Sequence, residues 1–204
     1  MNDTPRFARA IERFDAANAE DPNRVVVGAE ERSRELVYAD QLTAMLGRFA
    51  PEASEALRLA ARCQHLQRWK IPRSDYPMTR AGYHQWRTRL RDFHADLAAS
   101  ILRDAGYDDT MTGRVRSLIR KEALKTEPEA QMLEDVVALV FLESYLGDFV
   151  AGHGDYDEAK FFDILTKTAK KMSARGCDAA LTMIVLPSAL APVVRGAMGG
   201  GTTR

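Results

Sequence analysis

The chain has 204 residues, enough for one domain with its own hydrophobic core. Hydrophobic residues make up 46% and charged residues 28%, a composition that excludes a disordered, collagen-like or coiled-coil chain. Because 29 basic residues balance 29 acidic ones, no overall field draws the protein to nucleic acid or to a membrane, and we expect neither as a partner. Two cysteines, the absence of a signal-peptide pattern and the absence of a long apolar run predict a cytoplasmic location.

Helical periodicity recurs along almost the whole chain, and strand signals are nearly absent. The predicted helices cover about 6–19, 33–49, 54–67, 79–105, 109–125, 128–150 and 158–175. Helix-capping oxygens are expected from Ser54, Thr79, Asp108 and Asp157. The segments 20–32 and 71–78 are predicted to be irregular, the second because it contains two prolines. No repeat or linker divides the chain, which predicts one all-α domain over 1–198 and a flexible tail over 199–204.

Three carboxylates fall on helix faces that should point inward. Glu35 lies in the middle of the apolar face of the helix 33–49, and Glu122 continues the apolar stripe of the helix 109–125. Asp135 shares a face with Leu139 and Leu142 in the helix 128–150. A buried carboxylate costs several kcal/mol unless it is paired or bound to a metal. Each of the three therefore needs a partner.

Two histidines add to this set. His65 lies near the end of the helix 54–67, beside its buried side, and His94 borders the apolar stripe of the helix 79–105. If the histidines and the three carboxylates converge, their nitrogen and oxygen atoms suit a divalent metal such as Mn, Fe, Zn or Mg. The alternative is that each carboxylate pairs with its own arginine from a neighbouring helix, and for any single residue this is the more common arrangement.

Basic and aromatic residues alternate around the predicted loop 71–78: Arg68, Trp69, Lys70, Arg73, Tyr83 and Arg87. Guanidinium and ammonium groups can hold a phosphate or carboxylate while a neighbouring ring stacks on a planar group. This pattern predicts binding of a nucleotide or another phosphorylated metabolite. An equally weighted alternative is that the rings fill the core and the arginines neutralise the buried carboxylates.

Several short motifs carry a family resemblance: Arg68-Trp69-Lys70-Ile71-Pro72-Arg73, Tyr76-Pro77-Met78, Gly82-Tyr83, Trp86-Arg87, Phe93-His94-Ala95, Arg120-Lys121-Glu122 and Leu133-Glu134-Asp135-Val136. Across nearly its whole length the sequence resembles the domain of unknown function 4202 family, a bacterial and fungal group. This resemblance gives a family and no activity.

More distantly, the order of elements resembles the HD-domain metal-dependent phosphohydrolases, all-α proteins in which histidines and aspartates from several helices hold one or two metals. The resemblance aligns five places with the HD pattern, namely Glu35, the pair Gln64-His65, His94, Glu122 and Asp135. It implies an HD-domain-like bundle with metal ligands drawn from Glu35, His65, His94 and Asp135. The sequence departs from the pattern, because Glu replaces His twice and Gln-His replaces the His-Asp doublet. All the substitutes except Gln64 can still bind a metal, which favours an altered, carboxylate-rich site over decay.

The first functional hypothesis is therefore an HD-like, metal-dependent hydrolase that acts on a small phosphorylated metabolite or nucleotide. Glu35, His65 and Glu122 are its expected catalytic residues, and the metal would lower the pKa of a bound water. The basic and aromatic residues around the loop 71–78 would bind the substrate. The alternative is a non-catalytic protein that binds a small anionic ligand on the same fold. Redox chemistry at a two-iron site is a third hypothesis, and a homodimer is a further expectation.

Overall fold

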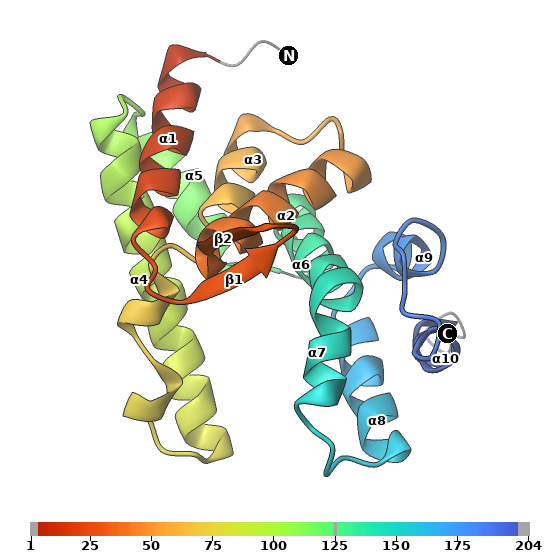
Figure 1. Ribbon diagram of the computed structural model, residues 1–204. Coiled ribbons are helices and arrows are strands. Elements are labelled where there is room, and N and C mark those ends of the chain that lie inside the picture. The colour runs from red at the N-terminus through yellow and green to blue at the C-terminus, as the bar shows by residue number, and fades with distance from the viewer. Residues whose placement is uncertain (1–3, 125, 200–204) are drawn as a thin grey trace.

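The computed structural model describes residues 4–124 and 126–199 and is built almost entirely from helices (Figure 1). In chain order the elements are α1 (Pro5–Ala19), β1 (Arg24–Val27), β2 (Glu30–Ser33), α2 (Arg34–Phe49), α3 (Glu55–Arg62), two short 3₁₀ turns (Arg68–Lys70 and Arg73–Asp75), α4 (Arg80–Asp104), α5 (Asp109–Arg120), α6 (Pro128–Val140), a π-helical turn (Phe141–Tyr145), α7 (Leu146–Ala151), α8 (Glu158–Ala169), α9 (Ala174–Thr182) and α10 (Ala191–Gly199). The prediction of an all-α fold is confirmed.

Helix starts follow the expected capping chemistry. The side chains of Ser54, Thr79, Asp108 and Asp157 each accept a hydrogen bond from a backbone N–H in the first turn of the helix that follows. Each cap satisfies one of the amides that lack a partner within the helix. These four predictions are confirmed.

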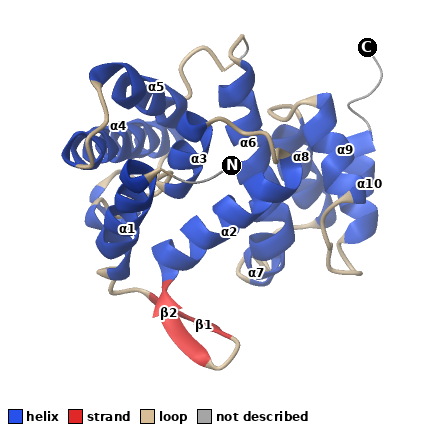
Figure 2. Cartoon of the chain, turned by 90° about the horizontal axis from the view of Figure 1, so that it is seen from above, coloured by secondary structure: helices blue, strands red, loops and turns tan. Residues whose placement is uncertain are grey.

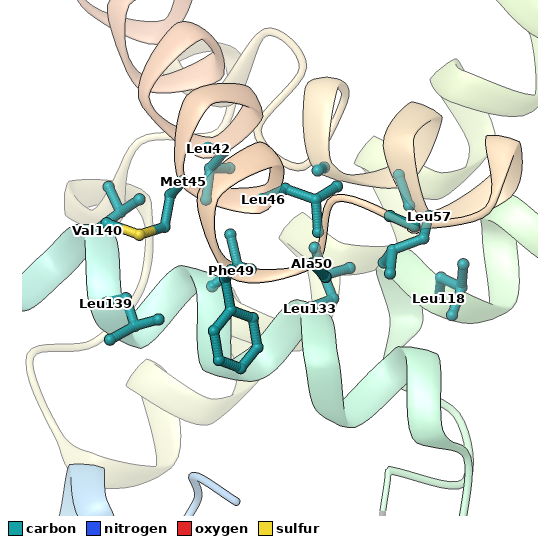
Figure 3. Packing of buried hydrophobic residues seen from close by; sticks show 14 of the residues in the cluster. Leu42, Met45, Leu46, Phe49, Ala50, Leu57, Leu118, Leu133, Leu139 and Val140 are labelled. Carbon is teal, nitrogen blue, oxygen red and sulfur yellow. The ribbon is translucent and has the colours of Figure 1, made fainter. Parts of the chain in front are cut away.

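The core is centred on the contact between α2 and α6. Four residues at helical spacing on one face of α2 are each at most 4% exposed, namely Leu42, Met45, Leu46 and Phe49. Figure 3 shows them facing Leu133, Leu139 and Val140 of α6, with Leu57 of α3 and Leu118 of α5 closing the same cluster. This packing fixes the first turn of α2, which carries Glu35, relative to the helices around it.

The segment 20–32 was predicted to be irregular and instead contains a short hairpin. Strand β1 pairs antiparallel with β2, with Val25 opposite Arg32. Gly28 makes the turn with a φ of 64°, a conformation that glycine adopts without strain. The hairpin projects from the helical body (Figure 2), and the side chain of Val26 is 75% exposed. Because so short a ribbon buries little, its hydrophobic pattern is too weak to predict a strand.

Several predicted helices end early. The helix predicted over 54–67 ends at Arg62, and Gln67 adopts a left-handed conformation while its backbone N–H donates to Asn18 Oδ1 at 2.9 Å. The helix predicted over 109–125 ends at Arg120 because Lys121 is left-handed, with a φ of 56°. The last residue of that prediction, Lys125, lies outside the described residues.

The C-terminal third has more elements than were predicted. The stretch 128–150 consists of α6, the π-helical turn and α7, and the stretch 158–175 divides into α8 and the start of α9. Helix α10 was not predicted, and it ends at Gly199, the first residue of the tail expected over 199–204. The rest of that tail, 200–204, lies outside the described residues. Among the described helices, none combines the length and apolar character needed to cross a bilayer.

Candidate functional site

A cavity of about 580 Å³ brings together charged side chains from several segments of the chain. It is lined by Val25, Arg34, Glu35, Tyr38, Gln64, His65, Arg68, Arg87, Lys121, Val137, Phe141, Tyr145 and Asp148. A larger cavity of about 750 Å³ lies beside α1, but its buried Arg62 is already paired with Asp15 and Asp40. The charged cavity is therefore the stronger candidate for a ligand site, and we call it the Glu35 pocket.

Glu35 occupies the first turn of α2, where its backbone N–H donates to Asp21 Oδ2 at 3.1 Å. The residue is only 8% exposed. Its carboxylate lies 3.4 Å from Nδ1 of His65 and 3.8 Å from Nε of Arg68. Burial raises the pKa of this carboxyl to about 7, even though the nearby Arg68 opposes the shift. Glu35 can therefore gain or lose a proton near neutral pH.

His65 lies in the turn after α3, and its ring stacks on Tyr38 with the centroids 4.2 Å apart. Burial lowers the pKa of His65 well below its ordinary value, and the positive charges of Arg68, Arg87 and Lys121 act in the same direction. The imidazole is therefore neutral. A neutral imidazole nitrogen can donate to an ionised carboxylate or accept from a protonated one, and Nδ1 is the ring atom placed 3.4 Å from Glu35.

Four basic residues line the pocket: Arg34 from the start of α2, and Arg68, Arg87 and Lys121 from three other segments. The guanidinium of Arg68 lies over the ring of Trp86, 4.7 Å from its centroid, and Trp86 Nε1 donates to the carbonyl of Ile71 at 2.9 Å. This contact ties the loop after α3 to α4, which carries Arg87 at the next position. Lys121 pairs with Glu134, and burial lowers the pKa of its ammonium group.

Arg87 differs from two of the other basic residues of the pocket, Arg68 and Lys121. Within the described part of the chain it forms no hydrogen bond or ion pair, although it lines the cavity and is half-buried. Its positive charge also disfavours the charged forms of Arg68 and Lys121. The pocket thus holds more positive charge than its own residues neutralise.

The opposite wall is aromatic and includes the π-helical turn. Phe141 and Tyr145 lie at the two ends of this turn, and the rings of Tyr38 and Tyr145 meet edge to face at 5.8 Å. The hydroxyl of Tyr145 donates to Gln41 Oε1 at 2.7 Å, which fixes the ring. Single π-helical turns are rare and occur frequently at functional sites.

His94 lies behind His65 and does not line the pocket. It is 2% exposed, and its ring centroid is 5.7 Å from that of His65. Its Nδ1 lies 2.8 Å from the carbonyl oxygen of Leu66, which can only accept, so Nδ1 carries the hydrogen. Burial, reinforced by the nearby His65, lowers the pKa of His94 to about 3. The residue is a neutral, structural part of the core.

Asp135 is buried, as predicted, but on another side of α6. Its oxygens accept from the backbone N–H and the hydroxyl of Ser173, at 2.8 and 2.5 Å, and from Gln131 Nε2 at 3.1 Å.

Glu122 was predicted to point inward and is exposed, because the left-handed Lys121 ends α5 before the apolar stripe reaches it. Neither this carboxylate nor that of Asp135 lies in the Glu35 pocket.

The residues present do not fit the divalent metal site that the HD-domain resemblance implies. Among the described residues, no group of three or more His, Cys, Asp or Glu is placed to hold a metal ion. Of the expected ligands only Glu35 and His65 meet, and two donors are fewer than the three protein ligands of typical catalytic zinc sites.

A family model with the description Domain of unknown function (DUF4202) matches residues 8–194. The chain belongs to this family. The match runs from α1 to α10 and includes every residue that lines the Glu35 pocket. No curated protein and no solved structure matches the chain.

Of the residues predicted to bind substrate in this DUF4202 chain, Arg68 and Arg87 line the pocket and the other four do not. Arg73 instead donates to the carbonyls of Tyr76 and Pro77, at 2.9 and 2.8 Å, and so holds its own loop. The remaining three are Trp69, Lys70 and Tyr83, of which the last is 43% exposed and packs beside Trp86.

The sequence prediction missed Tyr38, Lys121 and Tyr145 as pocket residues. A signal for Tyr38 was present, because it follows Glu35 by three positions and so shares its helix face. No local pattern marked Lys121 or Tyr145, whose positions depend on the left-handed residue after α5 and on the π-helical turn.

Proposed function

We propose that the protein binds a small anionic ligand, such as a phosphorylated metabolite, in the Glu35 pocket. The observation that supports this proposal is the group of Arg68, Arg87 and Lys121 around one cavity, with Arg87 lacking an anionic partner among the described residues. A partly buried guanidinium without a partner favours an anion, because the interaction is screened less there than at the surface.

The other walls suit a small organic molecule. A volume of about 580 Å³ falls within the usual range for small-molecule sites, in which apolar walls surround a few polar groups. The rings of Tyr38, Phe141 and Tyr145 supply apolar surface, and the arginines supply planar forks for phosphate or carboxylate oxygens.

The test is a ligand panel measured by thermal shift and calorimetry. Phosphorylated and carboxylated metabolites at 100 times their Kd should stabilise the fold by about 2.7 kcal/mol. Substitution Arg87→Met should weaken binding by about 10- to 100-fold, the contribution of a charge-assisted hydrogen bond. Arg89→Met is the matched control, because Arg89 is exposed on the same helix and does not line the pocket. If Arg87→Met binds as well as Arg89→Met, the pocket is not the site.

The Glu35–His65 contact favours a second candidate, hydrolysis of a bound phosphate ester. A general base works best when its pKa lies near the operating pH, and that of Glu35 is raised to about 7. His65 would hold the carboxyl in place through their 3.4 Å contact. A link to the HD-domain hydrolases is part of this second proposal.

Turnover assays separate the two candidates. A panel of phosphate esters is incubated with the protein, with and without added Mn²⁺, Mg²⁺ or Zn²⁺. For a hydrolase, Glu35→Gln should abolish turnover while ligand binding persists. Binding without turnover under every condition would leave the non-catalytic function alone.

A further inference from the structure

Two acidic residues, Glu35 and Asp148, line a pocket that also carries four basic ones, and of the two only Glu35 is buried. The side chain of Glu35 lies close to His65 and Arg68, which belong to the loop after α3. The positive charge of Arg34, its neighbour on α2, acts to lower its pKa. Asp21 approaches it from the segment before β1, and the pocket beyond carries Arg87 and Lys121 from the other side. Any anion that engages Arg68 therefore comes close to this carboxylate.

The carboxylate has little freedom to move aside. Glu35 is 8% exposed and lies in the first turn of α2, and its backbone N–H donates to Asp21. Moving it away would also break its contacts with His65 and Arg68. A bound ligand must therefore accommodate Glu35 where it is.

We propose that Glu35 determines the specificity of the pocket by selecting anions that carry a hydrogen-bond donor beside their negative charge. This inference rests on the proposed anion-binding function. An ionised carboxylate only accepts hydrogen bonds, so a fully deprotonated oxyanion meets it with repulsion between oxygens. A protonated phosphate oxygen, or a hydroxyl next to the charged group, instead donates a short charge-assisted hydrogen bond to Glu35.

Inorganic phosphate and sulfate provide the test, because both are tetrahedral dianions at about pH 8 and only phosphate then retains a proton. Calorimetry at matched ionic strength should show that the wild-type protein binds phosphate at least about tenfold more tightly than sulfate. In Glu35→Gln the amide can donate as well as accept, so sulfate should bind more tightly than it does to wild type. The ratio of the phosphate affinity to the sulfate affinity should then fall close to one.

Glu134→Gln is the matched control. Glu134 pairs with Lys121 and does not line the pocket. Its substitution removes one negative charge and loosens the hold on the Lys121 ammonium group, which only donates and so serves either anion equally. Both anions should then bind more tightly, with an unchanged ratio between them. This control separates a general effect of charge from the selection of a donor.

Two esters identify where the donor lies in a natural ligand. Methyl phosphate has no donor at about pH 8, whereas glycerol 2-phosphate carries hydroxyls beside its phosphate. A preference for the glycerol ester assigns the donor to a ligand hydroxyl. Equal affinities for the two esters, both weaker than the affinity for inorganic phosphate, assign it to a protonated phosphate oxygen.

The outcomes are distinct. Equal wild-type affinity for phosphate and sulfate, or a preference that persists in Glu35→Gln, overturns the inference and leaves the anion-binding function standing. If neither anion, nor any ester, binds the wild-type protein at millimolar concentration, the proposed function itself fails and the inference fails with it.

Discussion

The protonation of Glu35 links a single buried residue to the stability of the whole chain. Burial raises the pKa of this carboxyl from 4.5 to about 7 in the folded protein. The folded state therefore binds the proton more tightly than the unfolded state does. The resulting stabilisation is greatest below about pH 4.5, decreases as the pH rises to about 7 and stays low above that value.

Substitution Glu35→Gln should remove this dependence, because an amide does not titrate. The free energy of unfolding of Glu35→Gln minus that of wild type should be larger at about pH 8 than at about pH 5. The expected change in this difference is about 2 kcal/mol. Urea unfolding at the two pH values measures the difference. If Glu35→Gln changes the free energy of unfolding equally at both pH values, the carboxyl of Glu35 does not change its proton affinity on folding.

The sequence predicted whether a side chain points into the core only where the residue's position on a helix face determines it. Glu35 interrupts an apolar stripe at the 3.6-residue period, and the structure places it in the interior as that period requires. The same periodicity predicted a buried Glu122, and this prediction was wrong because α5 ends before it. Periodicity holds only as far as the helix extends, and the left-handed residue that ends α5 has no strong local signal.

At the scale of elements, Asp135 joins α6 to the start of α9. Its carboxylate accepts two hydrogen bonds from Ser173, which in turn caps α9 by accepting from the backbone N–H of Gly176 at 3.0 Å. Gly176 is the residue that lets the two helices approach, since a Cβ there would lie 2.6 Å from Cγ and Oδ1 of Asp135. The lack of a side chain at this position is therefore required by packing.

Substitution Gly176→Ala should destabilise the protein by about 1–3 kcal/mol, the usual cost of overpacking. Gly113→Ala is the matched control, because Gly113 lies inside α5 with nothing within 4 Å of an added Cβ. In a helix interior that change should stabilise by about 0.5–1 kcal/mol. Urea unfolding of both variants gives the comparison, and a neutral or stabilising Gly176→Ala would show that the junction can open without cost.

Helices were predictable as elements, and their ends were predictable only where the chain caps itself. Ser54 and Thr79 cap from within their own segments, so their positions follow from sequence. The segment after α3 leaves the predicted helix, and its left-handed residue Gln67 is held by Asn18, which is far away in the chain. Helix ends fixed by tertiary contacts of this kind are invisible to local patterns.

At the scale of the whole molecule, the Glu35 pocket is assembled from many segments: β1, α2, the loop after α3, α4, the residue after α5, α6, the π-helical turn and α7. The apolar faces predicted which residues turn inward, but not which of them meet. Glu35 and His65 meet, whereas Asp135 points to α9, an element that the sequence did not predict. Convergence is a property of the packed helices, and for that reason the five-residue metal hypothesis exceeded what one sequence can support.

The same assembly determines how the protein responds to acid. Burial lowers the pKa of His94 to about 3 and that of His65 well below 6.5, so both remain neutral in the fold at about pH 5–6. On unfolding they return to an ordinary pKa of 6.5 and each binds a proton, while Glu35 releases the proton that the fold had held. The unfolded state thus binds about one proton more than the folded state in this range.

The free energy of unfolding should therefore decrease by about 1.4 kcal/mol for each unit that the pH falls between about 6 and 5. Removing one buried imidazole with His94→Gln should make the profile nearly flat in this range. His84→Gln should leave the slope unchanged, because His84 is exposed on the same helix. Urea unfolding at closely spaced pH values measures all three slopes. A His94→Gln slope equal to that of wild type would mean that His94 does not stay neutral in the fold, since its contribution to the slope depends on that neutrality.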